Sequence, residues 1–121
     1  YDGCFPEHAR SLAVAGAEVY VASVAYLAGS AHRRGLYYRA RALENGMFAV
    51  VSGLSGELGP LKFDGGSAIY DPEGRLLAEV GAGDGVVSWQ FDRELLEETR
   101  RAHSLLADVR APAPVSQFEV M

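Results

Sequence analysis

The sequence predicts an α/β domain with a mixed sheet. Two apolar, β-branched runs, 19–25 and 47–52, show little alternation, which is typical of strands covered on both faces of a sheet. Segments with helical periodicity, 6–17 and 32–45, precede them, and the order helix–strand–helix–strand favours parallel pairing of the two strands. A hairpin predicted around residues 71–74 adds antiparallel strands, so the sheet is expected to be mixed.

The first helix is expected to begin at Pro6, because the missing N–H of a proline has no partner in a first turn anyway. Its apolar stripe is expected to consist of Ala9, Leu12, Ala13 and Ala17, with Gly16 as its end. The strand over 19–25 follows. Residues 27–31 are expected to form the loop that leads into the second helix.

The second helix is expected over 32–45 and should end at Gly46, which can adopt the left-handed conformation of a helix cap. Its apolar side is expected to carry Leu36, Tyr37, Ala40, Ala42 and Leu43, with the arginines largely on the other side. After the strand over 47–52, residues 53–60 hold three glycines and one proline. This stretch is expected to be a surface loop.

Short strands and a last helix are expected in the second half of the chain. The strands are predicted over 67–70, 75–80 and 86–91, and Asp71–Gly74 has the Pro and Gly positions of a type I turn. Asp92 can cap a final helix, with Glu94 in its first turn and Arg100 and Arg101 near its end. The tail after residue 106 contains prolines that cannot continue a helix.

Composition and charge exclude several classes of protein. The 121 residues are enough for one domain, and 11 Lys and Arg against 16 Asp and Glu give a net charge of −5. Nucleic acid is therefore not expected as a partner. A single cysteine excludes an internal disulfide and a Cys-rich zinc site, and it favours a cytoplasmic location. No apolar run reaches the roughly 18 residues of a membrane helix, so no membrane partner is expected.

Cys4 and His8 form the first group that could carry chemistry. Cys4 lies just before a predicted helix start and His8 lies one turn further on, so a nucleophilic Cys/His pair is conceivable. The alternative is that Cys4 is a small apolar filler and His8 a surface residue. The three histidines have no paired spacing for a metal, and no metal or cofactor is expected.

Charged and polar residues gather in two further places. Asp2 and Glu7 flank the first segment, and the second helix carries Arg39, Arg41, Glu44 and Asn45. Such groups can be catalytic. They can equally make the ion pairs and hydrogen bonds that fasten a loop to a helix.

Four segments carry motifs of one enzyme family in the correct order. They are Tyr1-Asp2 with Phe5-Pro6-Glu7 and Arg10; Gly16-Ala17-Glu18 before an apolar strand; Arg39–Asn45 in the second helix; and Phe63, Gly66-Ser67 and Ile69 with Asp71–Gly74. Together they resemble the carbon–nitrogen hydrolase (nitrilase) superfamily over nearly the whole chain. Three features depart from the family pattern: Cys4 stands where many members have Arg, Gly46 stands where Gln is frequent, and His32-Arg33-Arg34 replaces the common His-Trp.

The resemblance implies that residues 1–121 are a single, truncated domain, the C-terminal half of a four-layer αββα sandwich. It places the attacking cysteine one residue before Tyr1 and the glutamate base and the lysine further upstream, so no catalytic side chain is expected in this chain. The whole enzyme is then expected to hydrolyse a small amide or N-carbamoyl C–N bond through a cysteine thioester. Tyr-Asp after the nucleophile favours an amidase over a nitrilase.

Supporting roles also follow from the resemblance. The backbone N–H of Tyr1 is expected to help hold the oxyanion. Glu7 and Arg41 are expected to form an ion pair that ties the nucleophile turn to the second helix, with Asp2 and Asn45 supporting the same region. Tyr26, just past the end of a strand, either lines the acyl pocket or packs in the core.

Two alternatives stand beside this interpretation. A non-catalytic partner could bind another chain through an apolar sheet face made of residues 19–24 and 47–51. A small enzyme could instead rely on Cys4 and His8. Under the leading interpretation the missing N-terminal half covers that face, the enzyme forms a homo-oligomer, and residues 107–121 reach across to a neighbour.

Overall fold

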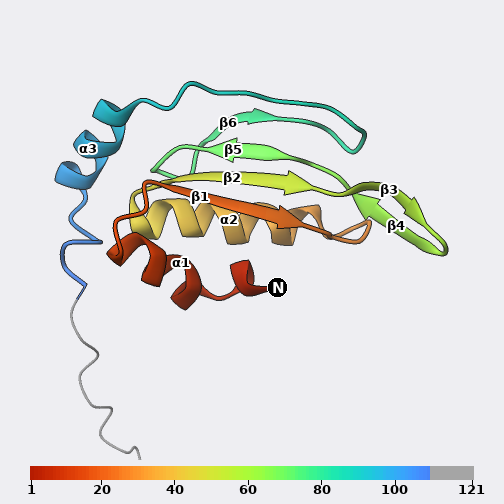
Figure 1. The fold of residues 1–121 in the computed structure, drawn as a ribbon, viewed down its shortest axis with the longest axis horizontal. Helices are drawn as coiled ribbons and strands as arrows, with labels where there is room; N and C mark the ends of the chain where they lie inside the picture. The colour runs from red at the N-terminus through yellow and green to blue at the C-terminus, as the bar shows by residue number, and fades with distance from the viewer. Residues whose placement is uncertain (110–121) are drawn as a thin grey trace, which may run out of the picture.

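The computed structural model describes residues 1–109 and contains three α-helices and six strands within that range (Figure 1). A short 3-10 helix, Asp2–Cys4 (η1), comes first. The elements that follow are α1 (Pro6–Val14), β1 (Val19–Val24), α2 (Ala31–Asn45), β2 (Phe48–Gly53), β3 (Ser55–Leu58), β4 (Leu61–Asp64), β5 (Ala68–Tyr70), β6 (Leu76–Glu79) and α3 (Arg93–Ala102).

The main sheet is mixed, as the sequence predicts. Its strand order is β1-β2-β5-β6, in which β1 and β2 are parallel and the other neighbours are antiparallel. α1 and α2 cover one face of this sheet (Figure 1). The β3–β4 hairpin extends from the end of the sheet opposite α3 (Figure 1). The sheet and the two helices therefore enclose the core, and the turns lie at the ends of the strands.

The core lies between the sheet and the two helices. Its buried members are Ala9 and Ala13 of α1, Tyr38 and Ala42 of α2, Met47, and Tyr20, Ala49, Val51, Ala68 and Tyr70 of the strands. The rings of Tyr20 and Tyr38 stack with centroids 6.3 Å apart, which joins β1 to α2 directly. Small alanines on both helices let them approach the sheet closely.

The opposite face of the sheet is only partly covered. Phe48 packs against Phe91, with ring centroids 4.8 Å apart, and is 2% exposed. Val21 in β1, on the same face, is 69% exposed. The expectation that both strands are covered on both faces is therefore wrong for β1. The predicted apolar face is also smaller than expected, because Met47, Ala49 and Val51 belong to the core.

The predicted apolar sides of the helices need correction. Leu12 is 40% exposed, and Ala17 lies beyond the end of α1 at Val14. In α2, Leu36 and Leu43 are 69% and 49% exposed, whereas Arg41 is 5% exposed. The predicted apolar side of α2 is correct for Ala42, which is fully buried, and for Tyr37, which packs against the core, and wrong for Leu36 and Leu43. Arg41 takes a buried place that the sequence did not predict, because a buried arginine is rare unless its guanidinium finds partners. The end of α2 is as predicted: Gly46 has a φ of 53°.

In the second half of the chain, one predicted loop and one predicted strand are wrong, and a predicted turn and a predicted helix cap are confirmed. Residues 53–60 contain β3, which pairs with β4 in an antiparallel hairpin, so the expected surface loop is wrong. Residues 86–91 are irregular rather than a strand. The turn Asp71–Gly74 is confirmed, since Gly74 N donates to Asp71 O at 2.9 Å. Asp92 caps α3 as predicted, because its side chain accepts from the backbone of Glu94 and Leu95.

Within residues 1–109, no helix is long and apolar enough to cross a membrane. The prediction for the tail over 107–121 falls mainly on residues 110–121, which lie outside the described residues.

Candidate functional site

The turn at residues 1–5 is closely held against α2. Cys4 N donates to Tyr1 O and Phe5 N donates to Asp2 O, each at 3.0 Å, which closes η1. Gly3 is buried, and a Cβ at this position would come within 2.5 Å of the hydroxyl of Tyr38. Only glycine therefore allows the turn to approach α2 this closely. Asp2 and Tyr1 are exposed, the latter at 96%.

Arg41 fastens this turn from α2. Its Nε donates to Gly3 O at 3.2 Å and its Nη2 donates to Cys4 O at 2.7 Å. Its Nη1 donates to Glu44 Oε1 at 3.0 Å, and this carboxylate is the acidic partner of Arg41 in the described part of the chain. The predicted ion pair with Glu7 is therefore wrong, although the predicted link between the turn and α2 exists. The guanidinium fork explains why the link goes to the backbone: it can serve two neighbouring carbonyls at once.

Asn45 lies one helical turn after Arg41 and is fully buried. Its Nδ2 donates to the backbone carbonyl of Arg41 at 2.9 Å, so it stabilises the last turn of α2. Its Oδ1 is buried and has no hydrogen-bond partner among the described residues. Arg41 therefore contacts the turn and Asn45 contacts the backbone of Arg41, whereas Glu7 is exposed at the start of α1.

A cavity of about 400 Å³ opens beside the turn. Its walls are Tyr1, Cys4, Phe5, Tyr26, Ser30, Arg33 and Tyr37. Tyr26 comes two residues after the carboxyl end of β1, where ligands of open α/β sheets tend to bind. It also packs against the core cluster. Tyr26 therefore lines this cavity and also packs against the core, and its role as a wall of the acyl pocket stays a prediction.

Cys4 and Tyr26 are in contact across this cavity. Cys4 Sγ and Tyr26 Oη lie 3.7 Å apart. Burial, and after it the hydrogen bond with Cys4, raises the pKa of Tyr26 above its ordinary value of 10.0. His8 Nδ1 instead lies 2.9 Å from Tyr20 Oη. Cys4 and His8 therefore contact different tyrosines and do not form the pair that a thiol nucleophile would need.

Comparisons with known proteins show the family of this chain. A family model described as carbon-nitrogen hydrolase matches residues 1–101. An (R)-stereoselective amidase from Pseudomonas sp. is 38% identical over 98% of this chain and 44% of its own length. The chain belongs to the carbon–nitrogen hydrolase family.

Solved structures of the superfamily share the fold. Saccharomyces cerevisiae Nit3, a member of branch 10 of the nitrilase superfamily, superposes with a TM-score of 0.82 at 29% identity over 87% of this chain and 40% of that one. A mutant amidase from Nesterenkonia sp. AN1, which shows covalent addition of the acetamide moiety of fluoroacetamide at the active site cysteine, has a TM-score of 0.64 at 34% identity over 70% of this chain and 32% of that one.

This carbon–nitrogen hydrolase chain spans about two fifths of the length of the curated relatives it matches: 39%, 42% and 44% of the first three. The resemblance inferred from the four sequence motifs is confirmed by the family match. Arg33, Ser30 and Tyr37 are the cavity residues that the sequence prediction missed. The departure from His-Trp at residues 32–34 was the signal that could have pointed to Arg33.

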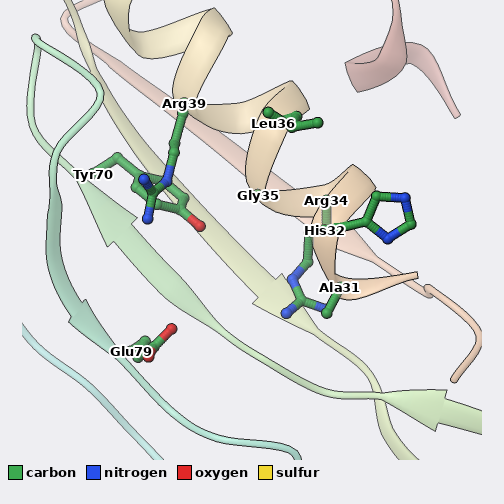
Figure 2. Close-up of a pocket in the computed structure, with 8 residues that line it drawn as sticks. All are labelled: Ala31, His32, Arg34, Gly35, Leu36, Arg39, Tyr70 and Glu79. Atoms are coloured by element: carbon green, nitrogen blue, oxygen red, sulfur yellow. The ribbon is translucent and has the colours of Figure 1, made fainter. Parts of the chain in front are cut away.

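A second hollow of about 440 Å³ lies between α2 and strands β5 and β6 (Figure 2). Arg39 projects over the ring of Tyr70, with its Cζ 5.5 Å from the ring centroid, and Glu79 lies on the far wall (Figure 2). Of the charged and polar residues that the sequence analysis singled out on the second helix, Arg39 lines this hollow, and Arg41, Glu44 and Asn45 do not. Within residues 1–109, no group of three or more His, Cys, Asp or Glu is placed to hold a metal ion.

Proposed function

We propose that this chain is the C-terminal part of an amidase that hydrolyses a small, non-peptide amide or N-carbamoyl C–N bond. In this proposal a cysteine immediately before Tyr1 is the nucleophile, and a glutamate base and a lysine lie further toward the N-terminus. The observation that carries the proposal is the anchored turn: Arg41 holds the carbonyls of Gly3 and Cys4 at the rim of a small cavity. The amidases among the relatives support the reaction class.

The reaction proceeds in two halves. The cysteine thiolate adds to the amide carbon, and the C–N bond breaks as the nitrogen takes a proton and leaves as ammonia or an amine. Water then attacks the thioester carbon and gives a proton to the glutamate, and the carboxylic acid leaves as the thiol is restored. One amide and one water thus give one carboxylic acid and one ammonia or amine. An N-carbamoyl group and one water give one amine and carbamic acid, which breaks down to carbon dioxide and ammonia.

The residues of this chain would position the reaction rather than perform proton transfer. The backbone N–H of Tyr1, directly after the nucleophile, would donate to the oxyanion of each tetrahedral intermediate. Arg41, whose backbone carbonyl accepts from Asn45, would hold that N–H and the cysteine in place. A shift of about 1 Å in such a site can cost about 100-fold in rate. Tyr26 would form a wall of the acyl pocket.

The test uses the full-length protein and fluoroacetamide, which can alkylate an activated thiol. We expect mass spectrometry to find one acetamide adduct on the residue that precedes Tyr1, and the Cys4→Ser variant to form the same adduct. Release of ammonia from a panel of primary amides should disappear when the preceding residue becomes alanine. Labelling of Cys4 alone, or a residue other than cysteine before Tyr1, would refute the proposal.

A second candidate, an interaction domain without catalysis, is favoured by one observation: Val21 is 69% exposed on the partly covered face of the sheet. Under the amidase proposal that face would pack on the N-terminal half of the sandwich, and further copies would make a homo-oligomer. The 121 residues alone should then self-associate, and sedimentation velocity would detect this. A full-length protein that binds a partner through Val21 and releases no ammonia from any amide would favour the interaction domain.

A further inference from the structure

We propose that the hollow between α2 and strands β5 and β6 binds a small oxyanion with two or more negative charges, such as a phosphate group. Arg34 and Arg39 supply the positive charge. The residues that line this hollow and those that line the cavity beside the turn of residues 1–5 do not overlap. The hollow is therefore a second site, and the proposal goes beyond the amidase function.

Two guanidinium groups without an acidic partner face this hollow. Arg34 and Arg39 both line it, and both side chains extend from α2 toward the sheet (Figure 2). Within residues 1–109, neither of them forms an ion pair. A guanidinium carries a permanent positive charge and five N–H donors in a planar fork. The ligand that complements two such groups is an oxyanion with more than one negative charge.

Arg34 is the more firmly placed of the two arginines. Its guanidinium lies against Gly66, where a Cβ would come within 2.0 Å of Nη2, so only glycine leaves this space free. The Nη1 of Arg34 is buried and has no hydrogen-bond partner among the described residues. A buried donor of a charged group is costly when it has no acceptor. An oxyanion beside the guanidinium would lower this cost by compensating its charge.

Arg39 and Glu79 set the charge of the rest of the hollow. The guanidinium of Arg39 lies over the ring of Tyr70, with its Cζ 5.5 Å from the ring centroid, and the side chain is exposed and free to turn toward a ligand. Glu79, on the far wall, is the only Asp or Glu among the lining residues (Figure 2). Two arginines against one glutamate leave an excess of positive charge. Glu79 opposes an anion, so its removal gives a test whose sign is known.

The hollow lies on the side of the sheet that α1 and α2 cover, since α2 forms one of its walls. In the proposed sandwich the N-terminal half would pack on the other face, where Val21 is exposed. The hollow would then stay open in the whole protein, a step that rests on the proposed function. Its volume of about 440 Å³ falls in the range of small-molecule sites.

The experiment is isothermal titration calorimetry of the full-length protein with inorganic phosphate, inorganic pyrophosphate and malonate, in a buffer of low ionic strength. Phosphate and pyrophosphate carry phosphoryl oxygens and malonate carries two carboxylates, so the series distinguishes the two sources of the charge. We expect a Kd of about 1 mM or tighter for at least one of the three anions. Added sodium chloride should weaken the binding, because it screens partly exposed charges.

Four variants assign the binding to the hollow. Arg34→Gln should raise the Kd by about 10- to 100-fold, as expected for charge-assisted hydrogen bonds. Arg39→Gln, at an exposed position, should raise it by about 2- to 5-fold, and Glu79→Gln should lower it by a similar factor. Arg101→Gln is the matched control: this exposed arginine of α3 forms no ion pair within residues 1–109 and does not line the hollow, so the Kd should not change.

Each outcome decides for or against the site. Opposite effects of Arg39→Gln and Glu79→Gln, with Arg101→Gln unchanged, support it, also where Arg34→Gln does not fold. Absence of binding of all three anions at about 10 mM overturns it. Equal weakening in Arg39→Gln and Arg101→Gln overturns it as well, because the protein would then attract an adventitious ion only. Weaker binding in Glu79→Gln has the same consequence. None of these measurements depends on amide hydrolysis, so this proposal and the amidase function stand or fail separately.

Discussion

Replacing Arg41 with alanine should destabilise the protein and slow the reaction together. Arg41 is 5% exposed and donates to Gly3 O at 3.2 Å and to Cys4 O at 2.7 Å. Each hydrogen bond from a charged group contributes about 1.5–3 kcal/mol, and both carbonyls would lose a partner. The Glu44 contact is 31% exposed on the carboxylate side, so it adds only about 0.5 kcal/mol. We expect a total loss of about 3.5–6.5 kcal/mol.

The assay is urea unfolding of the full-length protein followed by circular dichroism, with kcat/KM measured on the same samples. Because a single ammonium cannot reproduce the fork that serves two carbonyls, Arg41→Lys should lose about half as much stability as Arg41→Ala. Arg39→Ala removes an exposed guanidinium stacked on Tyr70 and should cost only about 0.5–1 kcal/mol. It controls for the loss of charge and of helix surface.

Two results would refute this reasoning. One is a rate loss in Arg41→Ala with an unfolding midpoint no lower than that of Arg39→Ala, since it would mean that the guanidinium acts on the reaction without anchoring the turn. The other is a loss in Glu7→Gln as large as that in Arg41→Ala. Glu7 is exposed and should stay within about 0.5 kcal/mol of the wild type.

Three further predictions concern single residues. Gly53→Ala should lower the free energy of unfolding in urea by more than about 3 kcal/mol, because its Cβ would lie 2.0 Å from Gly65 O. Gly81→Ala is the control: its Cβ would meet nothing within 4 Å, and the free energy of unfolding should change by less than about 0.5 kcal/mol. Equal effects of the two substitutions would contradict the close approach of Gly53 to Gly65. Asp92→Ala should cost about 1 kcal/mol through the lost cap of α3, and an unchanged melting temperature would count against it. Burial raises the pKa of Tyr26, so the folded state keeps the phenol proton to higher pH than the unfolded state. The contribution of this group to the free energy of unfolding is therefore fully present below pH about 10 and falls as the pH rises beyond it. Tyr26→Phe should show a shallower fall in unfolding midpoint between about pH 9 and 11 than the wild type, and an identical slope would contradict this.

The turn of residues 1–5 and the cavity beside it show where sequence reasoning stopped. The motifs correctly located the turn, and Arg41 was correctly associated with it, but the partner was misassigned. Pairing by charge pointed to Glu7, whereas the observed partners are the carbonyls of Gly3 and Cys4. Backbone carbonyls are present at every residue, so no sequence pattern marks the two that a guanidinium will reach. Arg33 was missed for a related reason, since only the fold places it across from Tyr1.

Local chemistry by itself determined the parts of this protein that depend on a few adjacent residues. Gly46 ends α2 because only glycine readily adopts a φ of 53°, Asp92 caps α3 because its carboxylate reaches the N–H groups that follow, and Asp71–Gly74 closes a turn. The family was likewise visible in short motifs. What only the tertiary structure decided depends on residues distant in sequence: which side of α2 is buried, that residues 55–64 pair as a hairpin, and that 86–91 do not pair as a strand. Burial and strand pairing are set by the surface that each segment meets, and that surface belongs to other parts of the chain.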